Sequence, residues 1–513
     1  MERSQLMVQQ IDLFIYNAVI VTQSKSVPIA TSMAIHNGKI IALFGHNDCS
    51  PYRAKINIDA QQKVILPGFI DAHCHLQAMV SEQFNIHIPT LYKTKETLFA
   101  YLREQISHIP TGNWVRINGY HPYHFPQIEP FTMAMLDELS TEHPIRLRYV
   151  TRHTSVLNSN AWDYFKHALE SHSKEGIHLE LNSFGQPTGI IHGADAFLNE
   201  FVLPKLPEAQ WLAGIKTLQS KLLSLGITTV CDASATTSAS QLTVWKKAAQ
   251  HFLNNQHHRM PGSAHFDDLA NHLQPIPIFK RNALKIVLET MPEIYPHQDT
   301  VVHMMKQAFL ANSPVAIHVV NPEMVWHAID ALQTVRQQLP EIKGICRFEH
   351  LSLCPEAFFE MLHENQIQVV TNPPFIDVHG DRYIQQVDDS EHSWLYPVHS
   401  LLQRGITVAA GSDAPVAPIS PWLGMHASCT RQSKDGLPVN MQEAVSKQEA
   451  LNLYTTHAAF VIGEQQRIGQ LAPGYDANFI IVEQHPLNCT LAQLRNMQVL
   501  ETWIAGERLY HSL

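Results

Sequence analysis

Residues 67–76 read Pro-Gly-Phe-Ile-Asp-Ala-His-Cys-His-Leu, and His73 and His75 stand at the end of this largely apolar run. Successive side chains of a β-strand point to opposite faces, so residues two apart share a face. His73 and His75 could therefore bind one metal ion with two imidazoles, while Cys74 faces the other way. A barrel strand delivers ligands to its C-terminal rim in this manner. In a chain with 32 histidines such a pair can also arise by chance, so a metal site requires further ligands.

The composition predicts a large folded protein. The 513 residues are 45% hydrophobic and 16% charged, which suits one big domain and a smaller one. The formal net charge is −10 and no Lys/Arg run stands out, so we expect neither nucleic acid nor a membrane surface as a partner. With no leader-like or membrane-length apolar segment, we expect a cytoplasmic location. The seven cysteines contain no CxxC pair and favour buried thiols, and the sequence leaves open whether the chain forms a homo-oligomer.

Both ends of the chain are rich in strand-like segments. These runs occupy residues 13–22, 34–44, 477–482, 499–504 and 508–510. Asn37-Gly38 is the preferred pair for a type I′ hairpin turn. Because isolated hairpins are marginally stable, we expect the two ends to pair in a small composite β-sandwich domain, residues 1–66 and 459–513.

Between the two ends, apolar strands alternate with helical segments, which indicates a parallel α/β architecture. The eight candidate strands are residues 65–73, 145–150, 227–231, 283–288, 314–319, 346–350, 367–371 and 406–410. This count predicts a (β/α)₈ TIM-type barrel over residues 67–458, with an inserted region around residues 77–200. Residues 253–281 are rich in His, Asn and Pro and are predicted to form a surface loop or lid.

Further polar residues follow the later strands. They are Lys285, His318, His350 and Asp413. A single residue of these types in a strand more often packs in the core or lies on the surface. As a set, however, the four would converge with His73 and His75 on the C-terminal rim of the barrel. Four imidazoles and a carboxylate suit one or two divalent ions, with Zn²⁺ favoured. A lysine can bridge two ions if CO₂ converts its amine to a carbamate, so Lys285 is a candidate carboxylated lysine.

With these motifs the chain resembles the metal-dependent amidohydrolase superfamily, and within it the amidohydrolase-3 group, which includes proteins similar to N-substituted formamide deformylase. The resemblance covers nearly the whole chain. Besides the strand-end motifs, matching segments are residues 67–76, 152–161, 185–191, 226–232, 411–416, 451–458 and 468–482. The resemblance implies a barrel with a composite β-sandwich and a one- or two-metal centre.

The resemblance also implies a role for each ligand. His73 and His75 would hold the more buried ion, and Lys285 would bridge as a carbamate. His318 and His350 would hold the second ion.

Asp413 would contact metal and water, take a proton as general base and pass it to the leaving nitrogen. The implied reaction is hydrolysis of the C–N bond of a small amide, N-acyl or N-formyl compound, or cyclic amide. His153 matches a family histidine that could line the pocket or contact an oxyanion, and a structural role fits it equally well.

The chain departs from the family pattern beside the expected pocket. Asn321-Pro322 follows His318 in place of Gly-Asp, and residues 289–293 replace an Asp-Gly-Ser stretch. The substrate therefore stays open. Candidate substrate-binding residues are His153, Asn372, His379, Trp422 and Arg431. Two alternatives remain. One is a deaminase or other C–N or C–O hydrolase on the same fold. The other is a non-catalytic amidohydrolase-like protein, in which ligand positions would be eroded, whereas all six are present here.

Overall fold

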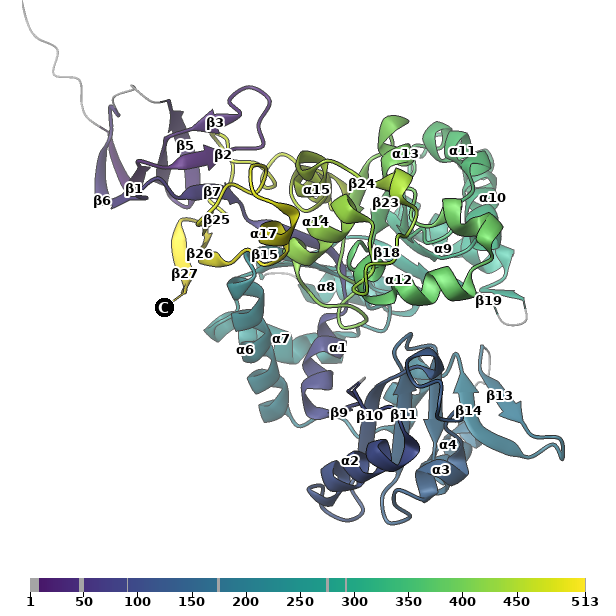
Figure 1. The fold of residues 1–513 in the computed structure, drawn as a ribbon. Coiled ribbons are helices and arrows are strands. Elements are labelled where there is room, and N and C mark those ends of the chain that lie inside the picture. The colour runs from purple at the N-terminus through teal and green to yellow at the C-terminus, as the bar shows by residue number, and fades with distance from the viewer. Residues whose placement is uncertain are drawn as a thin grey trace, which may run out of the picture. The chain divides into compact units, whose positions relative to one another are not determined.

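The computed structural model describes residues 9–45, 50–89, 91–172, 176–273, 276–290 and 293–512 (Figure 1). The chain divides into two compact units. The first unit contains residues 1–76, 215–288 and 296–513, and the second contains residues 77–214 and 289–295. Among the described residues, no helix combines the length and the apolar character needed to cross a lipid bilayer.

Two parallel sheets form the centre of the first unit. One contains β8 (Phe69–Cys74), β15 (Ile227–Asp232), β16 (Gln256–Arg259) and β17 (Phe279–Arg281). The other contains β18 (Leu284–Val287), β21 (Val315–Val319), β22 (Cys346–His350), β23 (Gln368–Thr371) and β24 (Val408–Ala410). Every neighbouring pair in the two sheets is parallel. Strands covered on both faces need apolar residues at nearly every position, which explains the continuous apolar runs in the sequence.

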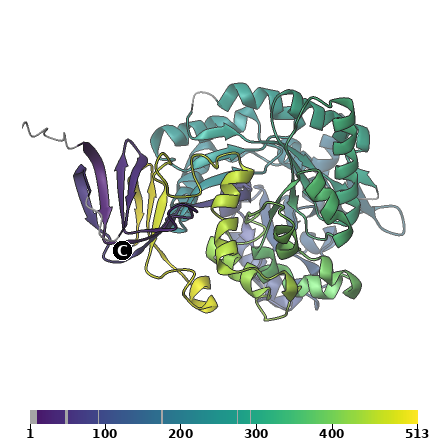
Figure 2. The same ribbon diagram turned by 90° about the horizontal axis from the view of Figure 1, so that it is seen from above.

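Helices alternate with these strands along the chain and lie around them in Figure 2. The main ones are α6 (Glu208–Ser224), α7 (Ala239–His251), α9 (Gln298–Leu310), α10 (Pro322–Gln338), α11 (Phe359–Glu364), α12 (Pro374–Gln386), α13 (Val398–Gln403), α14 (Pro421–Thr430), α15 (Lys447–Leu453) and α16 (Thr456–Val461). The predicted α/β alternation is therefore confirmed. Within the described ranges no strand ladder joins the two parallel sheets, although the segment after β24 approaches β8.

That approach requires a glycine. Asp413 donates its backbone N–H to the carbonyl of His73 at 2.8 Å, which brings the segment after β24 against the end of β8. A Cβ atom at Gly411 would lie 2.5 Å from the Cβ of His73, which is shorter than any normal contact. Gly411 thus lets Asp413 reach the histidine pair.

One predicted barrel strand belongs to the second unit, so that prediction was wrong. Residues 145–150 include β11 (Ile145–Tyr149), which pairs in parallel with β10 (Val115–Tyr120) and antiparallel with β12 (Thr154–Leu157). Its sheet has the order β13-β14-β12-β11-β10-β9, completed by β9 (Ile86–His87), β13 (His178–Leu181) and β14 (Pro187–His192). Helices α2 (Lys95–Ser107), α3 (Met133–Asp137) and α4 (Ser159–Ser171) belong to the same unit. A strand-like segment indicates that the chain pairs in a sheet, but it does not indicate which sheet.

The predicted lid at residues 253–281 was also wrong. This stretch supplies β16 and β17, which pair with each other, and β16 also pairs with β15; α8 (Phe266–Leu273) lies between them. The residues His257, His258 and Arg259 of β16 are buried inside the fold. Arg259 is fully buried, forms an ion pair with Asp232 and stacks over the ring of Trp245 at 4.5 Å.

Replacing Arg259 tests whether β16 is part of the folded core. Arg259→Ala leaves Asp232 as an uncompensated buried charge, so we expect the free energy of unfolding to fall by about 3–5 kcal/mol. A lid residue would change it by no more than about 0.5 kcal/mol. The measurement is denaturant unfolding. The matched control is Arg404→Ala, which removes a surface ion pair with Glu356 and should cost about 1 kcal/mol or less.

Strands from the two ends of the chain share one sheet. β7 (Val64–Pro67) pairs antiparallel with β25 (Phe479–Val482) and parallel with β2 (Val19–Val21). β3 (Ile29–Ala30), β26 (Val499–Ile504) and β27 (Glu507–His511) complete this sheet, and β1 (Gln10–Tyr16), β4 (Ser32–His36), β5 (Lys39–Phe44) and β6 (Arg53–Asp59) form a second one. Asn37 and Gly38 have φ values of 50° and 73° between β4 and β5, which confirms the predicted hairpin. Because β8 begins directly after β7, the pairing of β7 with β2 and β25 fixes where β8 starts.

Candidate metal centre

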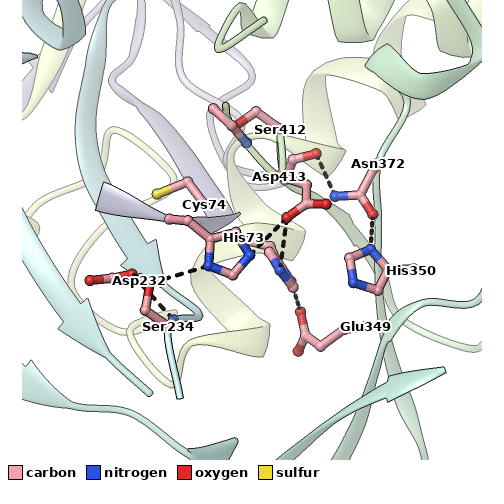
Figure 3. Close-up of polar contacts among 12 residues, drawn as sticks. His73, Cys74, Asp232, Ser234, Glu349, His350, Asn372, Ser412 and Asp413 are labelled. Carbon is pink, nitrogen blue, oxygen red and sulfur yellow. Dashed lines mark hydrogen bonds and ion pairs between the residues drawn. The ribbon is translucent and has the colours of Figure 1, made fainter. Parts of the chain in front are cut away.

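His73 and His75 point to the same place, as the strand alternation predicts. His73 is the fifth residue of β8 and fully buried, and His75 follows directly after the strand. Their Nε2 atoms lie 3.4 Å and 3.0 Å from the same carboxylate oxygen, Oδ1 of Asp413. Figure 3 shows His73 beside Asp413. Among the described residues, these three form the one group of three or more histidine, cysteine or acidic side chains whose ligand atoms all lie within 4.8 Å of one another.

Asp413 is held by its own segment. Its backbone has φ of 54°, in the left-handed region, and its N–H is bound to the carbonyl of His73. The neighbouring Ser412 donates from Oγ and from its backbone N–H to the buried carboxylate of Asp71, at 2.6 Å and 3.0 Å. Burial alone would raise the pKa of Asp413, but His73 and His75 outweigh it and hold this pKa well below its ordinary value. Asp413 is therefore a carboxylate near neutral pH.

Hydrogen bonds at Nδ1 assign the tautomer of His73. Its Nδ1 bonds to Oε2 of Glu349, a fully buried carboxylate on β22. Burial would raise the pKa of Glu349, but Arg347 and His73 lower it below the ordinary value. An ionised carboxylate only accepts, so the imidazole proton lies on Nδ1 and the Nε2 lone pair faces Asp413.

His75 has the same arrangement. Its Nδ1 lies 3.2 Å from Oγ of Ser234, and that hydroxyl donates its own proton to Asp232 at 2.6 Å. Oγ of Ser234 is then the acceptor of a hydrogen bond from Nδ1 of His75. The Nε2 lone pair of His75 is therefore also directed at Asp413.

The donor set fits a divalent cation. Two imidazole Nε2 atoms and a carboxylate oxygen face one another, an arrangement that a cation stabilises. Nε2 of His73 and Oδ1 of Asp413 are buried and make no hydrogen bond of normal geometry among the described residues. Burial and Lys285 lower the pKa of His73, yet Glu349 and Asp413 raise it overall, which reflects the same demand for positive charge.

His350 lies beside this group. Its ring centroid is 4.7 Å from that of His73, and its Nδ1 is 2.6 Å from Oδ1 of Asn372, whose amide donates to the carbonyl of Gly411 at 3.1 Å. Since that amide nitrogen is engaged, the amide oxygen faces His350, and its proton also lies on Nδ1. Burial lowers the pKa of His350 to about 3. The ring is neutral, as a metal-binding imidazole must be.

The structure also brings His318 and Lys285 to this end of the sheet. The ring centroid of His318, on β21, lies 4.6 Å from that of His350. Lys285, on β18, is buried, and its Nζ makes no hydrogen bond with the described residues. Burial lowers the pKa of this amine. A neutral amine is the form that can take up CO₂ as a carbamate.

The other four predicted substrate-binding residues each contact different neighbours. His153 belongs to the second unit, where its Nδ1 lies 3.3 Å from Glu289. His379 is buried on α12 next to Phe375. Trp422 packs edge-on against Phe69, at the opposite end of β8 from His73. The buried Arg431 donates to the main-chain carbonyls of Leu395 and Val439.

Sequence reasoning missed the groups that orient the ligands. No metal-ligand spacing in the sequence points to Glu349, Arg347 or Ser234. Asn372 is predicted to bind substrate, but in the structure it orients His350. The sequence does contain a signal for Glu349 and Arg347. Arg347 and Glu349 stand two apart in an otherwise apolar strand, so a charged pair shares one buried face.

The chain is similar to known proteins over nearly its whole length. Residues 57–510 match the model of the amidohydrolase family. The chain is 27% identical to N-substituted formamide deformylase of Arthrobacter pascens, over 98% of this chain and 99% of that protein.

Solved structures share the fold. An uncharacterised metal-dependent hydrolase of Pyrococcus horikoshii superposes with a TM-score of 0.74 at 20% identity, covering 94% of this chain and 99% of its own. An adenosine deaminase of Xanthomonas campestris with bound zinc gives a TM-score of 0.56 at 14% identity, covering 98% and 93%.

Proposed function

The chain belongs to the amidohydrolase family and is a hydrolase acting on carbon–nitrogen bonds, and we propose that it cleaves N-acyl, N-formyl or cyclic amides at the His73–His75–Asp413 centre. The observation that carries this proposal is the pair of Nε2 lone pairs directed at one carboxylate oxygen. N-substituted formamides are the first substrate class to test, because a relative that matches 98% of the chain is named for them. The proposed ligands are His73, His75, Lys285 as a carbamate, His318, His350 and Asp413.

Zinc is the metal we propose, in one or two ions, since imidazole nitrogen and carboxylate oxygen are its preferred ligands here. A bound divalent ion supplies Lewis acidity, which brings the pKa of water close to neutral and polarises an amide carbonyl. The chain's own part is to hold His73 and His75 in the tautomers that leave Nε2 free for the ion.

Asp413 is the proton carrier in this proposal. Its carboxylate accepts a proton from the attacking water, whose oxygen adds to the amide carbon. The carbon–nitrogen bond then breaks, and Asp413 returns the proton to the departing nitrogen. The products are a carboxylic acid, or formate, and an amine, and the carboxylate of Asp413 is regenerated.

We also infer that the two parallel sheets are the halves of a (β/α)₈ barrel, with β17 and β18 together as its fourth strand. Only Asn282 and Ala283 separate these two strands, and Asp413 links the segment after β24 to β8. The ligands then lie at the C-terminal ends of strands, where barrel enzymes place their active sites. The strands of residues 1–66 and 459–513 would be the composite β-sandwich.

Metal removal tests the proposal. Dialysis against a chelator should lower amide hydrolysis by at least about 10³-fold, because hydroxide is scarce without the ion. Adding back about one to two equivalents of Zn²⁺ per chain should restore it. The assay follows amine release from a panel of N-formyl, N-acyl and cyclic amides, with aminated heterocycles included to detect a deaminase. Full hydrolysis in a metal-free preparation would contradict the proposal.

A further inference from the structure

A buried arginine reaches the metal centre through Glu349. Nε of Arg347 donates to Oε1 of Glu349 at 2.5 Å, and the other oxygen of Glu349 accepts from Nδ1 of His73. We propose that Arg347 and Glu349 are positioning residues that hold His73 in its Nδ1–H tautomer and so determine whether Nε2 can bind metal. The inference rests on the proposed function, because it concerns how that metal centre is assembled.

Arg347 is fixed on every side. It is 1% exposed, and its remaining N–H groups meet acceptors on several elements. These acceptors are the carbonyls of Ala72 and Val461, the amide oxygen of Asn282, and the sulfur atoms of Cys231 and Met260. A guanidinium carries five donors in a rigid plane and keeps its proton in proteins. Glu349 therefore always meets a donor on the Arg347 side.

Arg347 also ties the two parallel sheets together. It lies on β22, whereas Ala72 lies on β8 and Cys231 on β15, which belong to the other sheet. The guanidinium of Arg347 donates to the backbone carbonyl of Ala72 at 3.3 Å, and Ala72 directly precedes His73 in the sequence. The position of Glu349 is thus set against the strand that carries the ligand it orients.

Glu349, held by Arg347, in turn orients the imidazole of His73. A carboxylate offers acceptors on both oxygens, so it satisfies Arg347 and His73 at once and leaves the imidazole proton only on Nδ1. The Nε2 lone pair then faces Asp413, 3.4 Å away. Any group that accepts from Arg347 but donates to His73 would reverse this tautomer.

Glu349→Gln makes that change at nearly constant shape. Because Arg347 can only donate, the amide oxygen must face Arg347 and the amide NH₂ must face Nδ1 of His73. We expect the His73 proton to move to Nε2 and the zinc affinity to fall by about 10–100-fold. Zinc affinity is measured by chelator competition. The tautomer is read by ¹⁵N NMR of the histidine-labelled, metal-free chain, with the His73 signal identified by its loss in His73→Asn.

A second variant separates positioning from a general loss of structure. In Arg347→Met/Glu349→Gln the donor is gone, so the amide can turn its oxygen to His73. We expect the Nδ1–H tautomer to return and zinc to bind more tightly than in Glu349→Gln alone. Glu443→Gln is the matched control, since Glu443 is also buried but accepts from Ser400. It should leave zinc affinity unchanged.

The outcomes are distinct. Wild-type zinc affinity together with an Nδ1–H signal in Glu349→Gln would overturn this inference and leave the proposed function standing. Equal zinc affinities for Glu349→Gln and the double variant would also overturn it. A wild-type chain that binds no zinc or other divalent ion would overturn the proposed function itself.

Discussion

Asp413→Asn is expected to lower kcat/KM for amide hydrolysis by at least about 10³-fold. A general acid–base group contributes about 10²–10⁴-fold, and an amide can neither accept a proton from water nor return it to nitrogen. The substitution also removes the negative charge that faces His73 and His75. We therefore expect weaker zinc binding in addition to the lost proton transfer.

The measurement is steady-state kinetics at saturating zinc, with bound zinc determined on the same sample. Asp389→Asn is the matched control, because the side chain of Asp389 is fully exposed. It should retain wild-type kcat/KM. A zinc-loaded Asp413→Asn enzyme within about tenfold of the wild type would show that another group carries the proton.

Lys285→Ala is expected to be the second most damaging substitution. If the carbamate bridges two ions, its loss removes one ion and the charge stabilisation that this ion gives the transition state, several kcal/mol in such centres. That corresponds to a fall in kcat/KM of about 10²–10³-fold, with zinc content falling to one ion or fewer per chain. Lys343→Ala removes an exposed lysine before β22 and should change neither quantity.

The dependence on CO₂ provides a separate check on Lys285. Reconstitution of the metal-free wild type with zinc should recover less activity in CO₂-free buffer than in bicarbonate. The Lys285→Ala variant should not respond to bicarbonate. Equal recovery of the wild type in both buffers would rule out the carbamate.

The candidate ligands could be found in the sequence because they lie in or shortly after segments whose pattern predicts strands. His73, His318 and His350 all lie at or near the ends of their strands, as the pattern predicts. Parallel strands bring their C-terminal ends to one edge, so residues far apart in the chain meet there. The sequence thus contained the elements of the site and their order.

Sheet membership could not be read in the same way. β11, Ile-Arg-Leu-Arg-Tyr, has the pattern of a strand, yet its partners are β10 and β12 in the second unit. β16 contains His257, His258 and Arg259, which resemble a polar loop, and all three are buried. Long-range partners such as Asp232 make such a strand stable, and no local pattern reveals them.

The orienting residues were hidden for a similar reason. The contact of Glu349 with His73 spans 276 residues, and that of Asn372 with His350 depends on the loop after β23. Ligand spacing identifies which atoms could bind metal. The tautomer that exposes those atoms depends on hydrogen bonds formed only in the folded chain.

The most direct test of the central claim is a crystal structure of the zinc-loaded protein with anomalous data at the zinc edge. Our account predicts a zinc peak about 2.0–2.1 Å from Nε2 of both His73 and His75, with Oδ1 of Asp413 in the same coordination sphere. A hydrolytically active crystal form with zinc bound elsewhere, or with no metal near these two imidazoles, would contradict it.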